Sequence, residues 1–353
     1  MVVKVSKPEI NVREKISELD KPSGTAGQAM LAAETPQEQF NLISAGRRNL
    51  LHNSQFMISQ RGDYVTNPLA IAGGTPTFTV DRWFTYANGA TSSAQIFNTT
   101  LPTGENVKSL KTIYTGSTAG SWLHPSQKIE PEYWMRGQPI TLSAWVRTNI
   151  ADYRLRICDT INCYMIGDAI PSDGEWHYIT ATHILPDNML LHEDSTSNNL
   201  QIQPAFQTTG QTLVQNESFV EFALMQAEIG PKATPFDYRT YAEELALCQR
   251  YFERYYPAAQ MPIYNESSVS NHKWIRIFHT IKRSVPSLAG HSGIVNKSTS
   301  GLGTISSITR QSGSLNEMSI RVGMSGSTGT SNAIYHFDPV AGSAYFDLDS
   351  EFI

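Results

Sequence analysis

From residue 49 onward, apolar and polar residues alternate in short segments separated by Gly, Pro, Asn, Asp and Ser. A period of two is the pattern of a β-strand with one buried face. The clearest predicted strands are residues 77–86, 140–148, 153–158, 176–184, 200–206 and 218–229. Gly104 and the pair Asp173-Gly174 predict turns. Short strands at this spacing predict an antiparallel β-sandwich over residues 49–240.

Residues 1–48 carry a different pattern. Asn11 followed by Glu14 is a capping-box signal, and Thr35-Pro36 marks a second helix start. Both predicted helices are too short to be stable alone. Either their apolar faces pack on the body of the chain, or the segment docks into a larger assembly. We favour the second interpretation.

A helical pattern returns after the sandwich. Leu245, Cys248, Phe252 and Tyr255 fall at helical spacing and Pro257 follows, which predicts a connector helix over 241–257. Residues 258–353 are again β-like. The pattern therefore predicts a mainly β protein: a β-sandwich with short N-terminal helices, one connector helix and a smaller C-terminal β domain.

Composition narrows the function classes. The 353-residue chain has a net charge of −5, which gives no basic field for phosphates and argues against nucleic acid as a partner. It shows neither a secretory signal nor an apolar run long enough for membrane insertion. Three cysteines cannot form a disulfide framework, so we expect buried free thiols at Cys158, Cys163 and Cys248 in a protein made in a reducing compartment.

Motifs for chemistry are missing from the sequence. It contains no GxSxG, GxxxxGK[ST] or HExxH pattern, so we predict that the protein is not an enzyme. His177 and His183 share a strand face but lie about 20 Å apart along it, too far for one zinc ion. A structural calcium ion is the other metal considered, and its candidate ligands are the loop acids Asp187, Glu193 and Asp194. In the alternative, these acids are solvated and bind no metal.

A sugar-binding face needs an aromatic platform ringed by planar polar groups. Alternation places one tryptophan, several guanidinium groups and amides on the polar sides of three predicted strands. The candidate glycan-binding residues are Trp145, Arg147, Arg154, Arg156, Gln201 and Gln203, with Glu221 as a possible acceptor. In the alternative, residues 53–56 or the connector helix cover Trp145, and the arginines form ion pairs with Glu221 and Glu228.

Other aromatic residues have two interpretations. We expect Trp83, Trp176 and Phe222 to pack in the core or at strand ends. Trp122, His124, Tyr133 and Trp134 lie in a turn-rich stretch. Exposed aromatic residues there mark either a loop site or a contact between chains.

Several segments carry a family resemblance. Residues 218–239, ending in Ala-Thr-Pro-Phe-Asp-Tyr-Arg, resemble the closing strand of the jelly-roll sandwiches of carbohydrate-binding modules. Together with further collinear segments, they resemble bacteriophage tail-fibre or receptor-binding virion proteins. The further segments are residues 46–56, 59–62, 79–84, 142–147, 173–178 and 234–251.

The resemblance implies a structural virion protein whose jelly-roll domain contacts host surface glycans. Residues 1–48 would attach it to other virion proteins, and a homotrimer is the expected assembly. Two alternatives remain: a purely architectural subunit (decoration, collar or nozzle) and a depolymerase acting on host polysaccharide.

Overall fold

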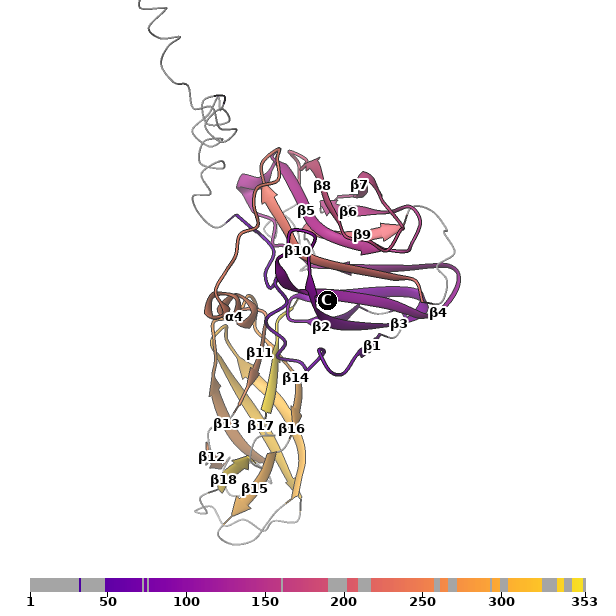
Figure 1. Ribbon diagram of the computed structural model, residues 1–353. Coiled ribbons are helices and arrows are strands. Elements are labelled where there is room, and N and C mark those ends of the chain that lie inside the picture. Colours follow the sequence, from indigo (N-terminus) through magenta and orange to yellow (C-terminus); the bar gives the residue numbers. More distant parts are fainter. Residues whose placement is uncertain are drawn as a thin grey trace, which may run out of the picture. The chain divides into compact units, whose positions relative to one another are not determined.

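The computed structural model describes residue 32 and residues 48–71, 73–74, 76–159, 161–189, 202–208, 217–256, 261–265, 272–292, 294–298, 304–325, 335–339 and 345–351. The chain forms two compact units, Met1–Arg48 and Asn49–Ile353. The predicted N-terminal helices and their attachment role lie outside the described residues. In Figure 1 the colours follow the chain from indigo to yellow through the labelled strands of the second unit.

The second unit is mainly β, as predicted. Its strands are β1 (Leu69–Ile71), β2 (Pro76–Val80), β3 (Trp83–Thr100), β4 (Asn106–Ser126), β5 (Pro139–Thr148), β6 (Tyr153–Asp159), β7 (Cys163–Ile170), β8 (His177–Ile184), β9 (Ile202–Thr208), β10 (Phe219–Ile229), β11 (Phe252–Tyr255), β12 (Met261–Asn265), β13 (His272–Phe278), β14 (Ser287–Ser292), β15 (Ile294–Ser298), β16 (Thr304–Gly313), β17 (Glu317–Ser325), β18 (Tyr335–Pro339) and β19 (Tyr345–Asp349). The helices are a short 3-10 turn η1 (Tyr133–Met135) and α4 (Tyr241–Gln249).

The long hairpin of β3 and β4 contributes to both layers of the sandwich, because β4 pairs with a strand of each layer. One end of β4 pairs with β10, which continues through β5 to β8. Its other end pairs with β9, which continues through β6 to β7. The turn that joins the two long strands contains Gly104 at φ 87°, a conformation that costs glycine little. The predicted 77–86 strand is divided by a tight turn in which Arg82 has φ 72°.

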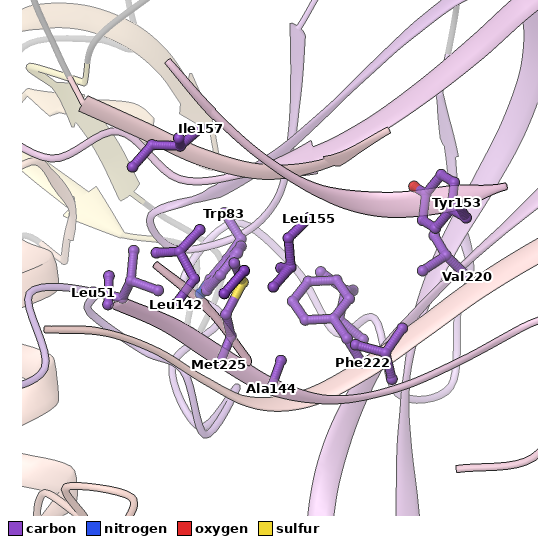
Figure 2. Packing of buried hydrophobic residues seen from close by; sticks show 14 of the residues in the cluster. Leu51, Trp83, Leu142, Ala144, Tyr153, Leu155, Ile157, Val220, Phe222 and Met225 are labelled. Carbon is purple, nitrogen blue, oxygen red and sulfur yellow. The ribbon is translucent and has the colours of Figure 1, made fainter. Parts of the chain in front are cut away.

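The core lies between these two layers. On β5, Ile140, Leu142, Ala144 and Val146 point inward and are buried. Figure 2 shows Leu155 and Ile157 of β6 facing Ala144, Met225 and Phe222 from the opposite side. The inward positions predicted for both strands are therefore confirmed, as is the burial of Trp83 and Phe222.

Strand β10 contains one extra residue. Between Ala223 and Gln226 it advances three positions while β5 advances two, and Leu224 adopts a left-handed φ of 50°. This β-bulge turns Leu224 out of the main core and into a second apolar cluster on the outer side of the sheet.

The segments that carry the family resemblance contact one another at the start of the sandwich. The Arg239 guanidinium donates to the backbone carbonyls of Asn49 and Leu51 and pairs with Glu244 of α4 at 3.2 Å. Asn53 donates through its side chain to the carbonyl of Asp81, and its own backbone N–H donates to Glu244. These segments, distant in sequence, form one buried hydrogen-bond network, so the resemblance rests largely on residues that hold the fold.

The connector helix is shorter than predicted. It begins with a capping box formed by Thr240 and Glu243 and ends at Gln249. The expected continuation through Phe252 and Tyr255 to 257 is wrong, because that aromatic-rich run forms β11 and pairs with β19. Aromatic residues favour strands, and the partner strand satisfies their backbone groups.

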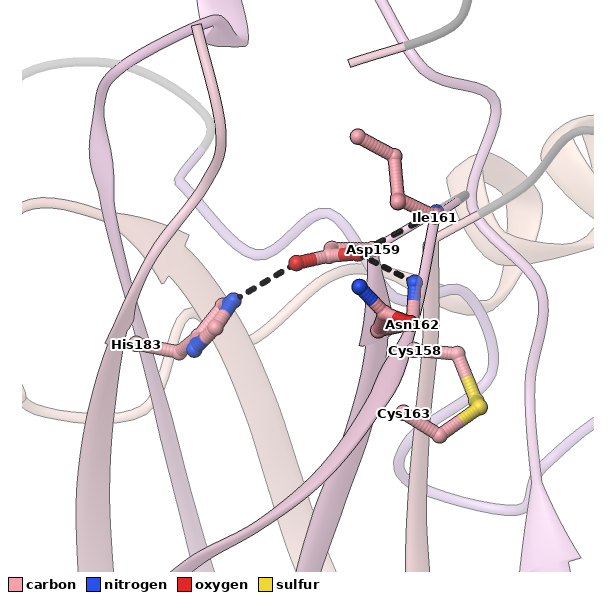
Figure 3. The surroundings of a disulfide bond; sticks show 6 residues. All are labelled: Cys158, Asp159, Ile161, Asn162, Cys163 and His183. Carbon is pink, nitrogen blue, oxygen red and sulfur yellow. Dashed lines mark hydrogen bonds and ion pairs between the residues drawn. A yellow bond between two sulfur atoms is a disulfide. The ribbon is translucent and has the colours of Figure 1, made fainter. Parts of the chain in front are cut away.

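The two cysteines of the β6–β7 hairpin correct a second expectation. Cys158 and Cys163 stand directly opposite each other and form a disulfide rather than buried free thiols. Figure 3 shows the turn between them, where Asp159 accepts the N–H groups of Ile161 and Asn162 and contacts His183 of β8 at 3.0 Å. Cys248 is a buried free thiol, as predicted.

The C-terminal strands form two smaller sheets, ordered β11-β19-β14 and β15-β18-β12-β13-β17-β16. Their apolar cluster is small and contains Ile277, Met318, Ile320, Phe346 and Leu348. A buried ionic cluster, which we call the junction, connects them to the sandwich. Its members are Arg61, Asp81, Arg82, Asp349 and Glu351.

Candidate functional site

The predicted binding residues do not share one surface. Trp145, Arg147 and Glu221 belong to the layer of β5 and β10, whereas Arg154 and Arg156 belong to β6 in the opposite layer. Both layers bury their inward residues in the same core. Their outward side chains therefore point away from each other, and the expected common face is wrong.

Among the described residues of the β6 and β9 layer, the predicted binding residues do not form a binding site. Arg154 pairs with Asp152 at 3.0 Å and donates to the carbonyl of Gly167. Arg156 is partly buried, and desolvation lowers the pKa of its guanidinium. Gln203 pairs through its backbone with Cys158, and its side chain is not described; Gln201 lies outside the described residues.

The outer side of β5 and β8 carries the aromatic residues. Trp145 is partly buried and lies opposite Tyr178, with ring centroids 5.4 Å apart. Tyr178 is 48% exposed. The Arg147 guanidinium lies 5.0 Å from the ring centre of Trp176, just before β8. We call Trp145, Arg147, Trp176 and Tyr178 the aromatic face.

A buried carboxylate fixes the arginine of this face. Glu221 is fully buried and accepts two hydrogen bonds from Arg147, at 3.0 and 2.8 Å, and one from Ser109 at 2.6 Å. Lys111 lies 4.0 Å away on the other side. Lys111, Glu221 and Arg147 thus form a row across three neighbouring strands. Glu221 is not available to a ligand; it holds Arg147 in place.

Arg147 itself remains accessible. Its side chain is 33% exposed. Glu221 occupies two of its N–H groups, and its remaining donors have no hydrogen-bond partner among the described residues. A guanidinium whose plane is fixed by a buried carboxylate presents these donors at a defined angle.

The structure settles in part whether Trp145 is covered. Its ring neighbour is Tyr178, whereas residue Phe56 of the 53–56 segment packs with Trp83 and Phe222 in the core. The proposed pairing of an arginine with Glu221 is confirmed. Glu228 instead accepts hydrogen bonds from Gln226 and Thr234, so the pairing proposed for it is wrong.

Two parts of this surface are not evident from the sequence. Tyr178 alternates outward on β8, but only the strand register places it beside Trp145. Trp176 is predicted to pack in the core or at a strand end. It is only partly buried, packs against the outer apolar cluster, and has the Arg147 guanidinium over its ring. Of the aromatic residues predicted in the turn-rich stretch, Tyr133 and Trp134 are exposed in η1. Trp122 and His124 lie on β4 instead; His124 is buried, and the side chain of Trp122 is not described.

A pocket of about 570 Å³ lies at the turn end of the β3–β4 hairpin. We call it the hairpin pocket. Its lining comes from widely separated segments: Gln55, Met57, Asn98, Thr99, Thr100, Asn106, Val107, Lys108, Leu224 and Tyr238. No short motif connects these residues, so no sequence signal could have located the pocket.

An apolar cluster connects the pocket to the aromatic face. Leu101, Ala223 and Leu224 form its buried part, and Val107, Trp145, Trp176 and Phe236 pack against it. Val107 and Leu224 also line the pocket. The two surfaces are therefore adjoining parts of one region.

The candidate metal ligands are not brought together. Among the described residues, no three His, Cys, Asp or Glu side chains form a group suited to a metal ion. Asp187 is exposed, and Glu193 and Asp194 lie outside the described residues. Within the same part of the chain, no helix has the length and apolar character to span a bilayer.

Comparisons with known proteins give weak structural similarity. No family model matches the chain, and no curated protein sequence is significantly similar to it. A similar solved structure is the enzymatically active domain of tailspike protein 4 from bacteriophage CBA120, with 12% identity and a TM-score of 0.31. That match covers 42% of this chain and only 19% of the tailspike chain.

Carbohydrate-binding modules show a comparable degree of similarity. TmCBM61, solved with β-1,4-galactotriose, has 10% identity and a TM-score of 0.32; the match covers 52% of this chain and all of that one. The family 11 module of a Clostridium thermocellum cellulase has 16% identity and a TM-score of 0.26, covering 46% and 99%. We therefore infer function from the residues of this chain.

Proposed function

We propose that this chain is a structural, non-enzymatic subunit of a bacteriophage particle that contacts host surface glycans through its aromatic face. Residues 1–48 attach it to other virion proteins, and it acts in the phage tail as a receptor-binding subunit. The virion assignment rests on the collinear segments that resemble tail-fibre proteins. The glycan assignment rests on the geometry of the aromatic face.

One observation carries the binding proposal: the pair of Trp145 and Tyr178 beside an arginine that Glu221 holds in place. Aromatic rings stack on the CH faces of sugars, and planar donors bond their hydroxyl groups. Both aromatic side chains are at least partly exposed to solvent, and the arginine needs little further ordering when it binds. A preorganised site loses less entropy on association.

A repeated subunit would compensate for a weak affinity at each single site. A homotrimer would present three copies of the face on one particle. Linked copies raise the effective affinity without any new contact, provided that the spacing of the receptors allows simultaneous engagement.

A glycan array with the purified full-length chain tests the proposal. We expect Trp145→Ala and Tyr178→Ala to weaken binding to the best glycan by about tenfold or more, the effect of losing about 1.4 kcal/mol. Trp134→Ala is the matched control, because Trp134 is an exposed tryptophan outside the aromatic face. It should bind like the unmodified protein.

The array, together with host adsorption and a reducing-end assay, separates the alternatives. A chain that binds no glycan, with Trp145→Ala silent in host adsorption as well, would be an architectural subunit. Release of reducing ends from host surface polysaccharide would identify a depolymerase and contradict the non-enzymatic assignment.

A further inference from the structure

The hairpin pocket has the lining of a binding site. Its polar rim includes Asn98, Asn106 and Gln55, and Met57 contributes an apolar wall. The ring of Tyr238 forms a further side and packs edge-on against Phe236, with centroids 4.9 Å apart. A volume of about 570 Å³ falls within the roughly 300–1,000 Å³ typical of small-molecule sites.

Charges near the pocket select an uncharged ligand. Lys108 is the one cationic residue of the lining. Opposite in sign, Glu105 accepts a hydrogen bond from the Tyr238 hydroxyl at 3.1 Å and so lies beside the pocket. An anionic group placed against Tyr238 would meet this carboxylate. Amides, hydroxyls and one aromatic ring suit a neutral polyol instead.

The position of the pocket relates it to the aromatic face. Trp145 lies directly opposite Ala223, and the next residue along β10 is Leu224, which lines the pocket. The path from Tyr178 on β8 to Val107 on β4 crosses three strand spacings, about 15 Å in total. This span is longer than a single sugar ring.

The β-bulge directs a side chain toward the pocket. Leu224 holds the left-handed conformation that non-glycine residues rarely adopt, and it leaves the main core to do so. Such conformations are unfavourable in themselves and gather at functional sites. With Val107, Leu224 forms the apolar floor that the pocket and the aromatic face share.

We propose that the hairpin pocket is a second saccharide subsite, which holds an uncharged sugar unit of the same glycan that stacks on the aromatic face. This inference rests on the proposed function. The glycan runs across the strands, from Tyr178 over Trp145 and Leu224 to the pocket. Short oligosaccharides reach only the aromatic face, and longer ones reach both subsites.

Calorimetric titration of the full-length chain tests the subsite. The probes are uncharged homo-oligosaccharides of glucose, galactose and N-acetylglucosamine, from one to six units. For the sugar that binds, we expect affinity to rise by about tenfold between the disaccharide and the tetrasaccharide. Asn98→Ala should remove about three- to tenfold from the tetrasaccharide, the effect of one lost hydrogen bond, and leave the disaccharide unchanged.

Further variants protect this test against misfolding. Asn98 is exposed, so its replacement should not disturb the fold. Tyr238→Ala should act like Asn98→Ala, whereas Tyr238→Phe, which keeps the ring, should bind like the unmodified chain. Asn188→Ala is the matched control, because Asn188 is an exposed asparagine outside the pocket lining.

The outcomes distinguish the two proposals. If no oligosaccharide binds, the proposed function is wrong and the subsite with it. If oligosaccharides bind without dependence on length, or if Asn98→Ala and Tyr238→Ala change nothing, the subsite is wrong while the aromatic face stands. Tighter binding of a tetrasaccharide ending in a uronic acid would overturn the uncharged assignment.

Discussion

The aromatic face and the junction each bury a carboxylate beside an arginine, but they support that charge differently. Glu221 receives three short hydrogen bonds, two of them from Arg147, and has Lys111 nearby. Asp81 receives hydrogen bonds from Gln60, and its contact with Arg61 is longer, at 3.4 Å.

Neighbouring charges also affect the pKa of Asp81. The pKa of Asp81 is raised to about 6, chiefly because the carboxylate is buried; the negative charge of Glu351 acts in the same direction, and Arg61 and Gln60 act against it. A carboxylate held by short, charged donors serves as a fixed support, whereas one with weaker partners makes its region sensitive to pH.

Removing the support at the aromatic face should have the largest effect. Glu221→Ala leaves Arg147 and Lys111 without their shared counter-charge and leaves Ser109 without its acceptor. We expect the free energy of unfolding to fall by about 3 kcal/mol, at the lower end for a broken buried pair because Arg147 is partly exposed. Urea denaturation measures the change.

The pair on the opposite layer provides the control for Glu221. Arg154→Ala removes the partner of Asp152, where both side chains are substantially exposed, and it leaves the left-handed Asp152 in place. Such pairs contribute about 0–1 kcal/mol. Equal losses for Glu221→Ala and Arg154→Ala would show that Glu221 is no special support.

The junction should respond to pH through Asp81. Because its pKa is raised on folding, the stabilising contribution of Asp81 is complete below about pH 4 and is lost as the pH rises through 6. Relative to Asp81→Asn, the unmodified chain should lose about 2–3 kcal/mol of unfolding free energy between pH 4 and pH 7. Denaturation curves at unit pH intervals measure this difference; a difference that does not change with pH would contradict the assignment.

The disulfide should have a somewhat smaller effect, confined to the layer opposite the aromatic face. Replacing Cys158 and Cys163 by serine opens a small loop with a sequence separation of five. Chain entropy predicts a loss of about 2 kcal/mol of unfolding free energy. Glycan binding should persist in the double variant at temperatures where it remains folded. Loss of binding in the folded variant would show that the two layers are coupled.

The sequence is informative about which way each side chain points and silent about which layer it belongs to. Alternation identifies the buried sides of β5 and β6 correctly, because burial follows a period of two. Both layers of a sandwich obey the same rule, so the pattern alone cannot separate Arg147 from Arg154. Strand order, which depends on long-range pairing, makes that separation.

Similar reasoning explains the other errors. Glu221 points outward as predicted, but its neighbours on β4 and β5 cover it, and only the register reveals them. Spacing along the chain does not reveal the cysteine pair, because only the hairpin places Cys158 opposite Cys163. The hairpin pocket combines segments nearly two hundred residues apart, beyond the reach of any local pattern.

The extra residue at Leu224 divides β10 into two phases. Up to Ala223 the odd-numbered residues face outward, and from Met225 onward they face the core. Loss of the Leu224 codon would restore a single phase and leave Glu221, Gln226 and Glu228 facing outward, but it would remove one side chain from the outer apolar cluster. A one-residue deletion here would therefore preserve the sandwich core and change only the outer surface that the hairpin pocket and the aromatic face share.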